Sequence, residues 1–160
     1  MNKYMEKALL EAQNGSRNGE GGPFGAAIVS KTGEIISLAH NQVLVNNDPT
    51  AHAEIQAIRN ACKILNTYNL KDYTLYTSCE PCPMCLSAAI WANIKDIYYG
   101  CTKEDAGKIG FRDDLIYEYL EGKNNNLLNK IELDRNECLQ VFNEYDEENR
   151  TIYYLSFGIF

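Results

Sequence analysis

Residues 80–85 read EPCPMC, and residues 52–54 read HAE. Together the two segments match the pattern H-x-E…P-C-x-x-C, which brings one imidazole and two thiols into a single motif. Imidazole and thiolate groups bind zinc well, and a catalytic zinc site keeps three protein ligands and leaves a fourth position for water. His52, Cys82 and Cys85 are therefore the predicted zinc ligands.

Both segments lie near predicted helix starts. Asp48 followed by Pro49 is typical of a helix N-terminus, and the apolar face of this helix would carry Ala57, Ile58, Ala61, Cys62 and Leu65. A second helix is predicted over residues 81–93. Cysteines three residues apart at a helix start lie about one turn from each other, so both sulfur atoms can reach one ion. The positive helix N-terminus also favours thiolate over thiol.

Glu54 follows the predicted ligand His52 by two residues. Zinc can lower the pKa of a bound water from about 15.7 to about 7, and a nearby carboxylate could carry the released proton onward. We assign this shuttle to Glu54. The alternative is a closed structural zinc site, part of a binding module without activity, in which Cys79 is the fourth ligand and excludes water. A closed site would have no use for Glu54.

The rest of the chain alternates between helical and extended patterns. Apolar residues recur with helical spacing over residues 2–14, and residues 14–23 form a glycine-rich turn region. The sequence predicts a hairpin at 24–30 and 34–43, strands at 74–78 and 96–102, a helix near 113–121, a strand near 130–134 and a helix near 136–148. This succession favours a layered α/β sheet with helices packed on it.

Length and composition fit one domain that binds a small substrate. The chain has 160 residues, 45% of them hydrophobic and 23% charged, and no apolar run as long as a membrane span. Its net charge of −7 comes from residues 104–160, which hold 13 acidic and six basic side chains. Phosphate backbones are bound through Lys and Arg, so we expect no nucleic-acid partner. Six cysteines without an export signal indicate a cytoplasmic protein with free thiols or metal ligands.

With these residues in place, the chain resembles the cytidine deaminase superfamily, and within it the bacterial guanine deaminases. The shared core consists of Asn41 and residues 47–54 and 77–85, whereas PFG at 23–25 and IGFRDD at 109–114 are similar to guanine deaminases in particular. The resemblance implies a three-layer α/β/α sandwich with a central mixed sheet, in a single deaminase domain over residues 1–160. It also implies a zinc-dependent hydrolase that converts guanine to xanthine and ammonia. Guanosine, cytosine and tRNA adenosine remain alternative substrates.

The resemblance further implies a set of substrate contacts. Asn41 would hydrogen-bond the purine, Phe24 would help to enclose the ring, and Asp113 would orient it, with the adjacent Asp114 as the alternative. Guanine deaminases are also similar in forming homodimers whose C-terminal segments cross over. Residues 130–160 are the corresponding segment here, and an aromatic residue, Tyr153 or Tyr154, could close the partner's site. The role of residues 151–160 stays open.

Overall fold

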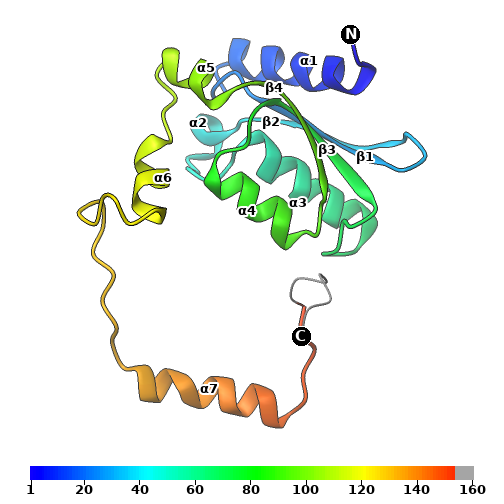
Figure 1. The fold of residues 1–160 in the computed structure, drawn as a ribbon. Helices are drawn as coiled ribbons and strands as arrows, with labels where there is room; N and C mark the ends of the chain where they lie inside the picture. The colour runs from blue at the N-terminus through cyan, green and yellow to red at the C-terminus, as the bar shows by residue number, and fades with distance from the viewer. Residues whose placement is uncertain (154–160) are drawn as a thin grey trace. The chain divides into compact units, whose positions relative to one another are not determined.

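The structure of the protein, a computed structural model, describes residues 1–153 (Figure 1). The described chain forms two compact units, the first covering residues 1–114 and the second residues 115–153. The first unit holds the sheet and both halves of the zinc motif, and each unit is described by itself below.

The first unit is built on a mixed sheet of four strands: β1 (Gly25–Ser30), β2 (Ile35–His40), β3 (Tyr73–Cys79) and β4 (Asp96–Cys101). The strand order is β2-β1-β3-β4. The strand β1 pairs antiparallel with β2 and with β3, whereas β3 and β4 are parallel. Parallel neighbours need a crossover connection, and α4 (Pro83–Trp91) lies in it. The mixed sheet agrees with the fold class expected from the sequence.

Helices cover both faces of this sheet, with α1 (Lys3–Arg17) on one side and α3 (Ala53–Leu65) and α4 on the other (Figure 1). Successive residues of β1 serve opposite faces. Ile28 belongs to the core cluster that includes Ala57 of α3. Gly25 faces α1 so closely that a Cβ atom there would lie 1.9 Å from the carbonyl oxygen of Ala8. The backbone of α1 therefore packs directly against β1.

Two helix boundaries differ from the sequence prediction. The helix α1 continues to Arg17 through Gly15, where a Cβ atom would lie 2.4 Å from the imidazole ring of His40. Gly15 thus makes room for a ring instead of ending the helix. The helix α3 begins at Ala53, with His52 as its N-cap residue, and not at Asp48. The Asp48 carboxylate accepts hydrogen bonds from the amide and hydroxyl of Thr50 at 2.8 and 2.7 Å, which closes a turn ahead of the helix.

Two short helices flank the site. The predicted second strand ends at His40, and α2 (Val43–Asn46) follows where the sequence predicted strand to residue 43. The helix α5 (Lys103–Lys108) follows β4, and a capping box formed by Thr102 and Asp105 starts it.

The second unit contains most of α6 (Asp114–Leu120), which begins at the last residue of the first unit, and α7 (Arg135–Glu147). The predicted strand at 130–134 is wrong: these residues have no regular structure, because no strand of this unit pairs with them. Neither helix has a buried residue. Within residues 1–153, no helix combines the length and the apolar character needed to cross a membrane.

Candidate metal and substrate site

Two helix N-termini bring the three predicted ligands together. His52 is the N-cap of α3, Cys82 is the N-cap of α4, and Cys85 lies in the first turn of α4. The Nδ1 atom of His52 lies 3.6 Å from Sγ of Cys82 and 3.5 Å from Sγ of Cys85. A tetrahedral zinc ion, with bonds near 2.1 Å to nitrogen and 2.3 Å to sulfur, separates such ligands by about 3.6 Å. The three side chains therefore fit a zinc ion without rearrangement.

The two cysteines differ in protonation. A hydrogen bond from the Cys85 thiol, with a further contribution from His52, lowers the pKa of Cys82 to about 4 in spite of its burial. The contact with Cys82, together with burial, raises the pKa of Cys85. Cys82 is therefore a thiolate at neutral pH, which is the form that binds a metal.

Cys79 does not join this group. Its Sγ atom lies 3.7 Å from the carbonyl oxygen of Thr102, and burial raises the pKa of its thiol to about 11. Among the described residues, the only group of three or more His, Cys, Asp and Glu side chains with metal-ligating geometry is His52, Cys82 and Cys85. The arrangement thus supports an open site with three protein ligands rather than a closed one with four.

Glu54 lies beside the ligands. Only 5% of this residue is exposed, and its Oε2 atom lies 3.2 Å from Sγ of Cys85. The hydroxyl of the fully buried Thr77 donates a hydrogen bond of 2.8 Å to Oε1 of Glu54. Burial raises the pKa of Glu54, although the hydrogen bond from Thr77 works in the opposite direction. A carboxylate whose pKa is raised is better suited to take up and release a proton than one with the ordinary value.

A pocket of about 470 Å³ opens over the ligands. This volume lies in the ordinary range for small-molecule sites. Its floor includes His52, Glu54 and Cys82, and its walls come from the glycine-rich segment, α2, α5 and the segment after α5. The wall residues relevant to binding are Gly21, Gly22, Phe24, Asn41, Phe111 and Asp113.

Comparison with known proteins places this geometry in a family. The model of the cytidine and deoxycytidylate deaminase zinc-binding region matches residues 1–101. The chain belongs to this deaminase family. It is a zinc deaminase, and His52, Cys82 and Cys85 are the zinc-binding triad of its matched region.

Among individual proteins, guanine deaminase from Bacillus subtilis is 51% identical over 118 residues, which cover 74% of this chain and 75% of that protein. An X-ray structure of guanine deaminase from the same organism superposes with a TM-score of 0.88 at 42% identity and covers 96% of this chain and 99% of that one. A tRNA-specific adenosine deaminase from Aquifex aeolicus is 43% identical over 106 residues, covering 66% of this chain and 69% of that protein.

The deaminase pocket brings the three predicted substrate residues together. Phe24, Asn41 and Asp113 all line it. The carboxylate of Asp114 instead binds the guanidinium of Arg112, with Oδ1 3.0 Å from Nε. Burial, followed by the charge of Cys82, raises the pKa of Asp113.

Sequence reasoning missed two residues of the deaminase pocket. The ring of Phe111 meets that of Phe24 edge to face, with centroids 5.0 Å apart, so two aromatic rings line this part of the wall. Glu80 accepts a hydrogen bond of 2.9 Å from the backbone amide of Lys103, which ties the zinc motif to α5. Phe111 lies two residues before Asp113 and Glu80 two residues before Cys82, and this proximity was the one signal in the sequence.

Proposed function

We propose that this protein deaminates guanine, with water as the co-substrate and xanthine and ammonia as products. The observation that supports it most directly is the buried Glu54 carboxylate on the pocket floor, 3.2 Å from the ligand sulfur of Cys85. The high identity to a guanine deaminase supports guanine as the substrate.

Each step that moves a proton is assigned to Glu54. Zinc, held by His52, Cys82 and Cys85, would supply a Lewis acid that makes water nucleophilic at neutral pH. Glu54 takes a proton from the attacking water and passes it to the ring nitrogen beside the attacked carbon. It then moves the second proton of that oxygen to the amine, so that the carbon–nitrogen bond breaks, ammonia leaves and the carbonyl of xanthine forms. The hydrogen bond from Thr77 holds Oε1 of Glu54, so the carboxylate keeps one orientation during both transfers.

The wall residues bind the purine. Phe24 and Phe111 pack against the ring, and Asp113 accepts hydrogen bonds from its N–H groups. The Oδ1 atom of Asn41 already accepts from the backbone amide of Val43 at 3.1 Å, so its Nδ2 hydrogens are the donor that it offers the purine. We assign the contact with the purine to Asp113 and not to Asp114, because the Asp114 carboxylate already accepts hydrogen bonds from the guanidinium of Arg112.

Ammonia release from purified, zinc-loaded protein tests the proposal, with guanine, guanosine, cytosine and adenine assayed side by side. We expect guanine to be preferred. Glu54→Gln should retain stoichiometric zinc and lose about 10²- to 10⁴-fold in kcat. The exposed Glu104→Gln serves as the matched control. Turnover retained in Glu54→Gln would overturn the role of Glu54, whereas preference for another base would overturn only the substrate.

Deamination of adenosine in tRNA is the second candidate, because a tRNA-specific adenosine deaminase is 43% identical. The excess of acidic residues in 104–160 counts against it, since a polyanion would be repelled. A tRNA substrate in the same assay separates the two. Tight, salt-dependent tRNA binding with inosine formation would favour the second candidate.

We also propose that residues 1–160 act as one deaminase domain within a homodimer, in which residues 130–160 exchange between subunits. Exposed apolar side chains of the second unit support a partner, among them Ile131 and Phe142 at 83% and 73% exposure. Tyr153 is exposed, and Tyr154 lies outside the described residues, so the choice of closing aromatic stays a prediction. Phe142→Asp should shift the dimer towards monomer in sedimentation analysis, and an unchanged dimer would contradict this interface.

A cytoplasmic location belongs to the same proposal. None of the six cysteines, which all lie within residues 1–153, forms a disulfide, and the zinc ligands Cys82 and Cys85 must stay reduced to bind metal. Fluorescence imaging of a tagged protein in its native host would test the location, and an extracytoplasmic signal would contradict it.

A further inference from the structure

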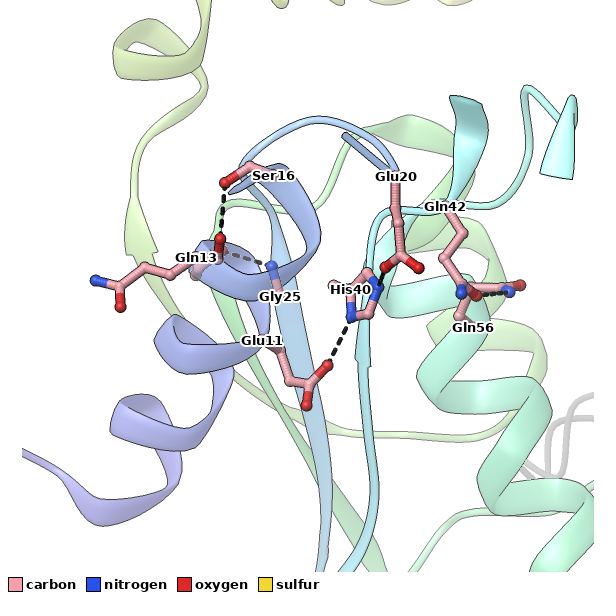
Figure 2. A network of polar contacts seen from close by, with 9 residues as sticks. Glu11, Gln13, Ser16, Glu20, Gly25, His40, Gln42 and Gln56 are labelled. Carbon is pink, nitrogen blue, oxygen red and sulfur yellow. Dashed lines mark hydrogen bonds and ion pairs between the residues drawn. The ribbon is translucent and has the colours of Figure 1, made fainter. Parts of the chain in front are cut away.

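His40, which is not part of the zinc triad, lies between two carboxylates at the end of β2 (Figure 2). Its Nδ1 atom lies 2.7 Å from Oε2 of Glu11 on α1, and its Nε2 atom contacts Oε2 of Glu20 in the glycine-rich segment. About a fifth of the imidazole is exposed. The ring fills the space that Gly15 leaves open on α1. The helix α1, the glycine-rich segment that follows it and the end of β2 therefore meet at one side chain.

Glu20 connects this cluster to the pocket wall. Its backbone carbonyl accepts hydrogen bonds from the amides of Leu44 and Val45 at 3.0 Å each, at the start of α2. The next residue, Gly21, lines the pocket and packs so tightly on Asn41 that a Cβ atom would lie 2.1 Å from Oδ1. Asn41 itself follows His40 directly. The position of Glu20 thus sets the position of Gly21, Asn41 and α2 together.

The cluster needs a proton that neutral histidine does not have. An imidazolium donates from both ring nitrogens, so it can satisfy Glu11 and Glu20 at once. Neutral imidazole donates from one nitrogen and presents a lone pair on the other, which would repel the second carboxylate. Burial works against the charge, but the hydrogen bonds to Glu11 and Glu20 outweigh it and raise the pKa of His40.

We propose that His40 is a positioning residue. When its ring is protonated it binds Glu11 and Glu20 together, a contact that we call the clamp, and so holds the pocket wall formed by Gly21 and Asn41 in place. Glu11 from α1 and Glu20 from the glycine-rich segment are the charged groups that act on the ring. On the α3 side, the neighbouring polar contact is the neutral pair Gln42 and Gln56, joined at 2.8 Å (Figure 2). At pH values below the pKa of His40 the ring binds both carboxylates and the wall is held. At pH values above it, the neutral ring keeps only one of the two carboxylates.

The kinetic test of this inference rests on the proposed function. KM for guanine should rise by about three- to tenfold as pH increases through the pKa of His40, with little change in kcat, because a charge-assisted hydrogen bond is lost from the wall and not from the reacting atoms. His40→Gln should show the high KM at every pH, since an amide cannot donate to two carboxylates from opposite sides.

Glu11→Gln gives the opposite result and makes the test specific. The glutamine amide can donate to the lone pair of neutral His40 while His40 donates to Glu20, so KM should stay low and lose this pH dependence. Glu6→Gln, an exposed acidic residue on the same helix, is the matched control and should behave as wild type. If KM depends on pH in the same way in wild type and in Glu11→Gln, the proposed effect of His40 on substrate binding is overturned.

A second readout needs no turnover. The chain has only two histidines, and zinc coordination keeps His52 from titrating, so NMR can follow His40 alone in the zinc-loaded protein. The amide signals of Gly21, Leu44 and Val45 should shift with the same midpoint as the His40 ring in wild type and not in His40→Gln. If the ring titrates and these amides do not move, the clamp is overturned even for an active guanine deaminase. If the amides follow the ring but guanine is not deaminated, the clamp stands and the proposed function fails.

Discussion

Thr77 fixes the orientation of Glu54, and its place on β3 explains how. Alternate residues of a strand face the same side of a sheet, and Leu75, Thr77 and Cys79 face the layer of α3 and α4. Thr77 is fully buried, so its hydroxyl needs a partner, and it donates to Oε1 of Glu54 at 2.8 Å. The carbonyl oxygen of Cys79 lies at 3.0 Å from the same hydroxyl.

Replacing Thr77 by Val should lower kcat about tenfold or more and leave zinc content unchanged. The two side chains have nearly the same shape, but Val cannot donate to Glu54, so the carboxylate would lose its fixed orientation. An unfolding cost of about 1–3 kcal/mol should accompany the change, because a buried oxygen loses its partner. Steady-state kinetics with metal analysis and urea unfolding measure the three quantities. Thr77→Ser restores the hydroxyl and should recover activity, and a Val variant with full kcat would contradict the role.

At this scale the sequence predicted the zinc triad, and the family comparison and the site geometry confirm it. The motif sufficed for the cysteines because they lie three positions apart at the start of one helix, which fixes their relation locally. The contact of Thr77 with Glu54 spans 23 residues and depends on how β3 packs on α3, so no local pattern could show it. The contact between Phe24 and Phe111 is more distant still in sequence and was missed for the same reason.

The glycine-rich segment between α1 and β1 acts as an element in its own right. The sequence predicted a glycine-rich turn region here, and Gly19 has the positive φ of 72° that such a turn allows. Gly21 serves a different purpose, since it lets the backbone approach Asn41 at the pocket wall. The glycine content of the segment indicates a turn, but the contact of Gly21 with Asn41 can be found only from the fold.

Gly21→Ala should raise KM for guanine at least about tenfold while the protein still folds. The added Cβ atom would lie 2.1 Å from Oδ1 and 2.5 Å from the backbone oxygen of Asn41, so Asn41 or the segment must move. Gly107→Ala is the control, because its Cβ atom would have 4.0 Å to the nearest side-chain atom and alanine favours the helix. Kinetics and circular dichroism compare the two variants. A wild-type KM in Gly21→Ala would show that this close approach does not shape the pocket.

Helix existence was predictable and helix starts were less so. The amphipathic pattern located α1 and α3, because each has an apolar face at helical spacing. Asp48 and Pro49 suggested a start for α3 that the structure places at Ala53, since the Asp48 side chain bonds Thr50 and not a helical amide. The consequence for the site is direct, because only the later start makes His52 an N-cap residue.

For the whole molecule, zinc should contribute strongly to stability. The ligands come from the starts of α3 and α4, so a bound ion adds a strong link between two helices that are otherwise joined by packing and by the contact of Cys85 with Glu54. Removal of zinc by a chelator should lower Tm, with a loss of about 4 kcal/mol if free zinc was at 1,000 times Kd. Differential scanning calorimetry before and after chelation measures this.

Cys79→Ser is the matched variant for that experiment. Its thiol faces the carbonyl oxygen of Thr102 and not the triad, so the variant should keep one zinc per chain and show the same loss of Tm on chelation. Loss of zinc in Cys79→Ser would instead support the closed four-ligand site.

The pH dependence of stability should carry the signature of His40. Its pKa is raised in the folded protein, so its contribution is complete below the unfolded value of about 6.5 and is lost as pH rises through the folded pKa. The contribution should be about 1 kcal/mol or less, because both carboxylate partners are partly exposed. Urea unfolding of wild type and His40→Gln from pH 5.5 to 9 measures the difference. A difference that does not shrink towards alkaline pH would contradict the assignment.

The contact between Gly25 and Ala8 connects helix α1 to the pocket. Gly25 has no room for a side chain on the α1 face, while its neighbour Phe24 directs an aromatic ring to the pocket wall. The peptide bond between Phe24 and Gly25 therefore couples the packing of α1 to the position of the Phe24 ring. Directed evolution for purines of a different size should accordingly find useful changes at Ala8 and Ala12, on the far side of the sheet from the metal.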